Sequence, residues 1–190
     1  MSFRRVWIAV REFFFFHARS RDREKRLVAV GGIHVFESHT PCRLVSAEPQ
    51  GVVKDLGWTD TLALEARSEG TAEVVCGTKR IKVELVAPAR LAIELVDQGT
   101  PTGVIVQERF RVQAQLYDGL GRELEVGKFT NFEWTCSGVL AVANDRSAGE
   151  FGFCDTCYGM HNFRALVPGE CMIEARLGGV QGKLKIEASA

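Results

Sequence analysis

Short runs of alternating hydrophobic and polar residues recur along the chain from residue 27 onward. Hydrophobic side chains on every second residue lie on one face of a β-strand, and the polar ones lie on the other. We therefore expect each run to be a strand with one buried face. The side chains expected in the core are Leu62, Leu64, Ala66, Ile81, Val83, Leu85, Leu91, Ile93, Leu95, Phe110, Val112, Ala114, Leu116, Leu184, Ile186 and Ala188.

The segments between these runs favour an antiparallel architecture. Turn sequences such as SEGT, DGLG, VPGE and LGGVQG separate strands of five to seven residues. A parallel sheet would need helical crossovers, and no run after residue 26 has helical periodicity. The pattern predicts an all-β fold of antiparallel β-sandwiches.

The strand pattern also repeats within the chain. SEGTAEVVCG at 68–77 and VPGECMIEARLGG at 167–179 each give a turn ending in glycine, an alternating strand and further glycine. Two copies about 100 residues apart indicate tandem domains. Pro88 interrupts the strands between them, in a connector too short for the domains to move freely. We expect domains at 27–87 and 88–190.

Residues 1–26 differ from the rest, with eight basic residues against three acidic ones. They contain no run of about 20 apolar residues that could span a membrane. At helical spacing the apolar residues share one face, which would suit an interfacial helix and membrane contact through residues 1–16. The alternative is a misassigned start or a degraded signal region. The residues of the apolar face are Phe3, Val6, Trp7, Val10, Phe13 and Phe14.

The composition narrows the classes of partner that we expect. The 190 residues carry 24 basic and 24 acidic side chains, so no net charge favours nucleic acid. The six cysteines are an even number and suit disulfide pairing in an oxidising, extracytoplasmic compartment.

Several characteristic sequence features occur together between residues 91 and 190. They are an alternating first strand and the stretches FRVQAQLYDGLGREL, FEWTCSGVLAVA and FRALVPGECMIEARLGGVQGKLKI. This half resembles the bacterial immunoglobulin-like repeats of intimin- and invasin-type surface proteins. The first copy is a weaker match, because it has no tryptophan equivalent to Trp134 and only about 60 residues. The resemblance implies two tandem immunoglobulin-like sandwiches, the first incomplete or divergent. The most specific matching positions are Gly169, Ile173, Ala175 and Gly178.

Cys136 follows Trp134 by two residues and so shares its strand face, and Cys171 starts the penultimate strand. In the immunoglobulin-like order implied by the resemblance these strands are antiparallel neighbours. We expect a Cys136–Cys171 disulfide, with a pair of buried thiols as the alternative. Cys42 and Cys76 remain as disulfide candidates of the first domain.

The segment 144–162 is longer than the corresponding turn of the family and contains FCDTCYGMH. Cys154 and Cys157 are expected to tether it as a disulfide. A zinc site with His161 and Cys171 is an alternative, but its spacing departs from known zinc motifs. Free thiols are another alternative, and a redox pair would need a helix and a βαβ context that the sequence lacks.

The same segment concentrates aromatic residues and methionine, the side chains typical of interface anchors. It is therefore a candidate binding loop, although Phe151 and Phe153 could instead cap the open end of the sandwich. The candidate binding residues are Phe151, Phe153, Tyr158, Met160 and His161.

Motifs for catalysis, phosphate binding or calcium binding are missing from the sequence. We therefore expect a non-enzymatic module without a cofactor. The resemblance implies a surface or periplasmic spacer that binds a protein or another cell-surface ligand. The alternative is a thiol-redox or metal-binding protein that works through the Cys154/Cys157 loop.

Overall fold

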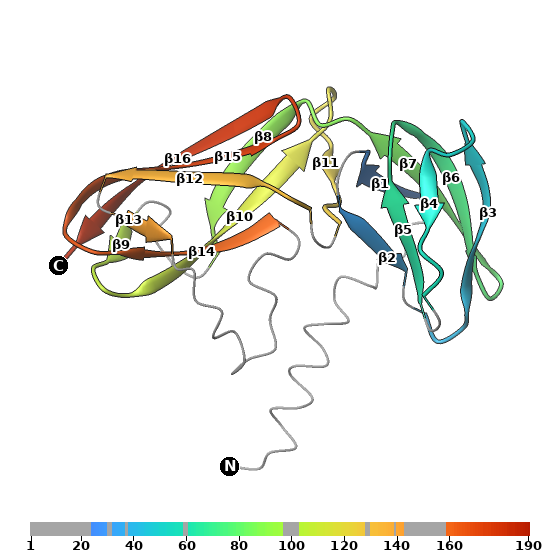
Figure 1. Cartoon of the computed structure of the whole chain (residues 1–190), viewed down its shortest axis with the longest axis horizontal. Coiled ribbons are helices and arrows are strands. Elements are labelled where there is room, and N and C mark those ends of the chain that lie inside the picture. Colours follow the sequence, from blue (N-terminus) through green and yellow to red (C-terminus); the bar gives the residue numbers. More distant parts are fainter. Residues whose placement is uncertain are drawn as a thin grey trace, which may run out of the picture.

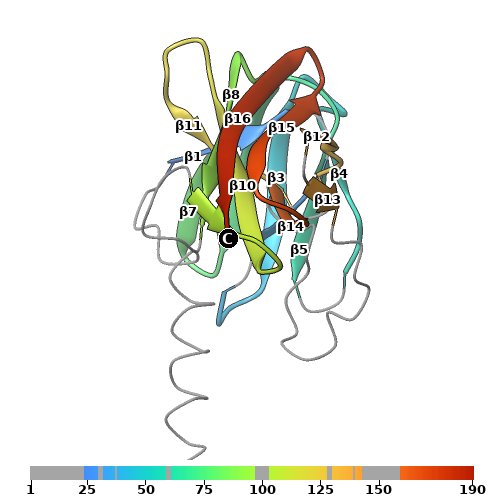
Figure 2. The same ribbon diagram turned by 90° about the vertical axis from the view of Figure 1, so that its left-hand side faces the viewer.

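The computed structural model describes residues 24–29, 32–36, 38–58, 61–96, 103–127, 130–138, 140–142 and 159–190. Within them, every named element is a β-strand. The predicted all-β fold class is confirmed. Two sandwiches follow one another along the chain (Figure 1). Seen from the C-terminal side, the second sandwich lies in front of the first (Figure 2).

The first sandwich consists of a four-stranded sheet, β1-β7-β6-β3, and a three-stranded sheet, β2-β5-β4. Their inward side chains form one hydrophobic core between the sheets. Its first strand begins at Glu24, within the segment that the sequence assigns to the N-terminal region. The strands are β1 Glu24–Val28, β2 Ile33–Phe36, β3 Cys42–Glu48, β4 Val53–Asp55, β5 Leu62–Ala66, β6 Gly70–Cys76 and β7 Lys79–Val86.

The second sandwich has the same plan. One sheet is β11-β10-β14-β13, with β8 also paired to β10, and the other is β12-β15-β16-β9. The strands are β8 Arg90–Leu95, β9 Gly103–Ile105, β10 Arg109–Tyr117, β11 Glu123–Leu124, β12 Glu133–Gly138, β13 Leu140–Val142, β14 Met160–Ala165, β15 Gly169–Leu177 and β16 Val180–Ser189.

In both sandwiches a short early strand pairs in parallel with the last strand: β1 with β7, and β9 with β16. The remaining strand pairs are antiparallel. In the first sandwich this parallel pair joins the first strand to the last, whereas in the second the paired strand β9 follows β8. Both β1 and β9 are edge strands of their sheets.

The alternating pattern correctly identifies the core strands. Along β10 every second side chain is buried, from Phe110 to Leu116. Leu95 and Leu184 were expected in the core but are half-buried at its margin.

Trp134 is also half-buried, because β12 is an edge strand of its sheet. Its ring still faces the core, where it meets Phe132, His161 and Phe163 at centroid distances of 6.1, 5.4 and 6.1 Å. His161 and Phe163 lie on β14 of the opposite sheet. The aromatic cluster therefore connects the two sheets of the second sandwich.

Candidate functional site at the domain junction

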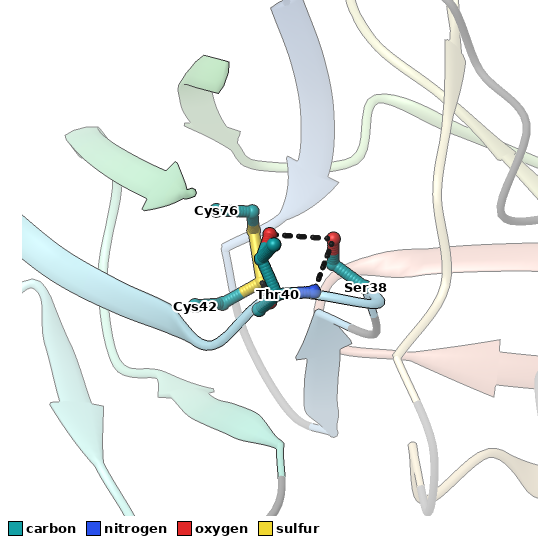
Figure 3. Close-up of a disulfide and its surroundings, with 4 residues drawn as sticks. All are labelled: Ser38, Thr40, Cys42 and Cys76. Carbon is teal, nitrogen blue, oxygen red and sulfur yellow. Dashed lines mark hydrogen bonds between the residues drawn. A yellow bond between two sulfur atoms is a disulfide. The ribbon is translucent and has the colours of Figure 1, made fainter. Parts of the chain in front are cut away.

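A disulfide joins Cys42 and Cys76 in the first sandwich, with an S–S distance of 2.03 Å. The two residues lie directly opposite each other at the start of β3 and the end of β6. Ser38 and Thr40 lie beside the bond, and the Ser38 hydroxyl accepts a hydrogen bond from the Thr40 amide (Figure 3). The bond fastens the edge strand β3 to its neighbour.

The predicted Cys136–Cys171 disulfide is wrong: both residues are thiols in this structure. Strands β12 and β15 are antiparallel neighbours, as expected, but Cys136 lies opposite Ile173 and Cys171 lies opposite Gly138. The cysteines are diagonal neighbours, which are typically about 7–8 Å apart and beyond the usual reach of a disulfide.

Burial raises the pKa of both the Cys136 and Cys171 thiols. The Cys171 thiol donates a hydrogen bond of 3.4 Å to the Ile186 carbonyl. A raised pKa leaves little reactive thiolate at neutral pH. This pair therefore has the character of core residues and not of a redox centre.

Most of the predicted binding loop lies outside the described residues: Phe151, Phe153, Cys154, Cys157 and Tyr158. The proposed Cys154–Cys157 tether and its metal and redox alternatives therefore stay predictions.

Met160 and His161 do not belong to a loop, because β14 begins at Met160. The His161 ring stacks on Trp134 and meets the edge of Phe163 at 4.9 Å. The His161 ring thus packs inside the sandwich and is not an exposed interface anchor. Among the described residues no three histidine, cysteine or acidic side chains gather as a metal site. Within the same ranges, no helix is long and apolar enough to cross a membrane.

The sequence did not predict a network of polar contacts that lies where the two sandwiches meet. Leu27 of β1 forms a parallel bridge with Glu125, which follows β11 of the second sandwich. The Val28 amide donates to the Glu125 carbonyl at 3.2 Å, and the Glu125 amide donates to the Arg26 carbonyl at 2.9 Å. The edge of one sheet is therefore extended by backbone from the neighbouring domain.

Ion pairs surround this bridge. The Lys25 ammonium lies 3.0 Å from both carboxylate oxygens of Glu125. Glu84 of β7 pairs with Arg26 at 3.3 Å and with Arg122 of the second sandwich at 4.0 Å. The Lys25 side chain is only 16% exposed, so water screens its pair with Glu125 less than it would screen a fully exposed pair.

Asp118 holds the turn that presents β11 to this junction. Its buried carboxylate accepts hydrogen bonds from the backbone amides of Leu120 and Arg122 and from the Arg122 guanidinium. Burial alone would raise the pKa of Asp118, but these bonds and the nearby guanidinium charge lower it overall. The carboxylate therefore remains ionised and keeps Arg122 directed toward the junction.

Apolar packing reinforces the bridge. Leu27 belongs to the core of the first sandwich, whereas its neighbour Val28, with no exposed surface, belongs to the core of the second. Glycine at position 32 allows the backbones to approach, because a Cβ there would lie 2.1 Å from the Thr130 hydroxyl. A single strand thus contributes side chains to two domains.

The strand order now identifies the architecture. In each sandwich one four-stranded sheet contains the last two strands of that sandwich, flanked by an antiparallel strand on one side and by the parallel strand β1 or β9 on the other. The other strands form the second sheet, which packs on the first over a hydrophobic core. Both sandwiches are immunoglobulin-like.

No family model matches this sequence, and no curated protein matches it. Solved structures similar to the chain include domains 5-6 of the S-layer protein SbsC, with 16% identity, a TM-score of 0.34, and coverage of 86% of this chain and 92% of that chain. The Escherichia coli adhesin FdeC has 16% identity and a TM-score of 0.35, covering 86% and 61%. The D0-D1 domain of intimin has 14% identity and a TM-score of 0.31, covering 86% and 84%. At these values the likeness carries no argument about function, and strand order alone assigns the immunoglobulin-like architecture.

His34 lies beside the junction and contacts the strand that forms it. Its buried ring bonds through Nε2 to the Val28 carbonyl at 3.2 Å. Burial lowers the pKa of His34 below its ordinary value of 6.5, although the bond to Val28 and the Glu125 carboxylate act in the opposite direction. The folded protein therefore binds fewer protons at this residue than the unfolded chain below pH 6.5.

We expect the contribution of neutral His34 to stability to be complete above pH 6.5 and to decline as the pH falls below that value. His34→Gln, whose amide can still donate to the Val28 carbonyl, should flatten this decline. The free energy of unfolding in urea, measured from pH 7.5 to about 5.5, tests this expectation. His39→Gln, at an exposed position of the same domain, is the matched control. An equal decline in wild type and His34→Gln would contradict the assignment.

Proposed function

We propose that the chain is a non-enzymatic, extracytoplasmic module of a surface protein, in which the two immunoglobulin-like sandwiches form a rigid spacer that presents a ligand-binding unit. The observation that carries the proposal is the backbone bridge between Leu27 and Glu125. Domains joined only by a short linker move relative to one another by default unless their interface is large and apolar. Here hydrogen bonds, ion pairs and the shared Val28 oppose that motion.

Two further features support this proposal. The Cys42–Cys76 disulfide suits an oxidising compartment. The ion pairs at the junction involve side chains of both domains, so they stabilise one relative orientation in addition to each fold. The partner would be a protein or another cell-surface ligand.

Reversal of one charge at the junction tests the spacer. Glu125→Arg places a cation beside Lys25, so repulsion replaces the attraction across the bridge. We expect the two sandwiches of the wild-type chain to tumble as one body, and those of Glu125→Arg to reorient independently at low salt. Residual dipolar couplings and ¹⁵N relaxation of the full chain measure this directly.

Glu174→Arg is the matched control, because Glu174 pairs with Lys183 at 2.7 Å entirely within the second sandwich. It reverses a similar charge without touching the junction, and both domains should keep a common alignment. Independent tumbling of the wild-type sandwiches would refute the rigid spacer.

A further inference from the structure

In both sandwiches the last strand pairs in parallel with a short early strand, so the residues of the two strand pairs can be compared position by position. In the first, Val28 lies opposite Val86, and the Ala29 amide donates to the Val86 carbonyl at 3.0 Å. In the second, Ile105 lies opposite Ser189, and the Val106 amide donates to the Ser189 carbonyl at 2.9 Å. By strand pairing, Ile105 is therefore the equivalent of Val28.

The surroundings of these two equivalent residues are opposite. Val28 has no exposed surface because the second sandwich covers it, whereas the exposed fraction of Ile105 is 48%. Both strands lie at the edge of their sheets, but only β1 has backbone from another domain bonded along its outer side. Within the described residues, the end of the second sandwich thus exposes Ile105, whereas the equivalent residue of the first sandwich is buried against the neighbouring domain.

Neighbouring residues enlarge this apolar surface. Leu166 and Val167, in the turn between β14 and β15, are 45% and 52% exposed. Gln107 fixes that turn beside Ile105: its amide donates to the Ala165 carbonyl at 2.8 Å, and its side chain donates to the Leu166 carbonyl at 3.0 Å. We call Ile105, Leu166 and Val167 the end patch.

The corresponding end of the first sandwich is more polar. The turn between β5 and β6 carries Arg67, Ser68 and Glu69 where the second has Leu166, Val167 and Pro168. Arg26, which pairs with Glu84, is replaced by Gly103, while Glu84 is matched by Glu187. Lys25, the cation that pairs with Glu125, stands one residue before Arg26, and the residue one before Gly103 in the sequence is the uncharged Thr102. The second sandwich therefore lacks the cation that pairs with Glu125 at the first junction.

We propose that the end patch and the edge of β9 bind another immunoglobulin-like domain through a hairpin like the one around β11, with an uncharged residue where Glu125 stands. The hairpin accepts a hydrogen bond from the Ile105 amide and covers the Ile105 side chain, as the Val28 amide donates to the Glu125 carbonyl and the second sandwich covers Val28. This inference rests on the proposed spacer function and names the spacer's next partner. The chemistry required is an apolar hairpin with one free backbone carbonyl and one free amide.

An extended chain supplies such a domain in the matching geometry. Ala190 corresponds to Ala87 of the linker, so Pro-Ala and a second copy of residues 90–190 are added after it. Two forms of the appended copy are compared, one with Glu125 and one with Glu125→Val. An increase in the near-UV circular dichroism signal over that of the unextended chain verifies that the appended copy is folded.

The readout is amide hydrogen exchange at Ile105, with Val28 as the internal reference for a bridged amide. We expect the Glu125→Val extension to slow exchange at Ile105 by roughly tenfold relative to the unextended chain, and the Glu125 form to slow it less. Unchanged exchange at Ile105 with a folded Glu125→Val extension would overturn the proposal. A failure of the spacer itself would appear separately, as independent motion of the first two sandwiches.

Ile105→Glu and Val45→Glu form a matched pair, because Val45 on β3 is 45% exposed and far from the end patch in sequence and fold. In the unextended chain both should leave the thermal midpoint unchanged. In the extended chain only Ile105→Glu should restore fast exchange at position 105. A lower midpoint for Ile105→Glu alone would mean that Ile105 has a structural role in the isolated chain and would overturn the inference. So would concentration-dependent dimers of the unextended chain that Ile105→Glu abolishes, since the occupant would then be a second copy.

Discussion

Replacing both Cys42 and Cys76 with alanine is expected to lower the free energy of unfolding of the first sandwich by about 3–4 kcal/mol. The disulfide joins residues 34 positions apart, and a cross-link of that span removes much of the freedom of the unfolded chain. It also fastens the edge strand β3, which has a sheet neighbour on only one side. Urea unfolding followed by tryptophan fluorescence measures the loss, in a background with Trp7→Phe and Trp134→Phe so that Trp58, on the connection after β4, is the remaining tryptophan.

Cys136→Ala is the control for this variant, since it removes a half-buried thiol that forms no disulfide. It should change the Trp58 transition little. A reductant should lower the wild-type Trp58 midpoint toward that of the double variant. If the double variant unfolds at the wild-type urea concentration, the bond contributes no stability and the assignment fails.

Phe163→Ala is expected to lower the free energy of unfolding of the second sandwich by about 3–5 kcal/mol. The Phe163 ring has no exposed surface and stacks on Phe110 at a centroid distance of 6.0 Å. It also makes T-shaped contacts with Trp134 and His161, so its removal leaves a cavity between the two sheets. Calorimetry and near-UV circular dichroism follow the transition.

Trp134→Ala should cost less than Phe163→Ala, because the Trp134 ring is half-buried on an edge strand. Trp58→Ala, at an exposed position outside both cores, should change stability by less than about 0.5 kcal/mol. A larger loss of stability for Trp134→Ala than for Phe163→Ala would show that the centre of the second core lies nearer to β12 than the structure places it.

The alternating pattern predicts which face of a strand is buried, and for β7 and β10 it does so at every position. It does not predict register, because a shift of two residues leaves every side chain on the same face. The prediction of a Cys136–Cys171 disulfide was wrong for this reason. Both residues face inward as expected, but the pairing is offset by two positions.

The junction was missed for a different reason. Lys25 and Arg26 follow a basic segment, so their charges resemble a continuation of it, and their strand is short. The acidic partner of Lys25 lies 100 residues later, beyond what any local pattern can connect. The turn at DGLG, which begins at Asp118, was correctly predicted. That turn also positions β11 against another domain, which depends on the assembled fold.

The parallel pairing of β1 with β7 has a mechanical consequence for a spacer. The chain enters the first sandwich at the beginning of β1 and leaves it at the end of β7, and these two points lie at opposite ends of the paired strands. A pull along the chain therefore slides the two strands past each other and loads all their hydrogen bonds together, whereas an antiparallel hairpin pulled from its open end would lose them one at a time. Tension is thus resisted in shear by the first sandwich, and single-molecule pulling should show an abrupt rupture force for it in place of gradual unzipping.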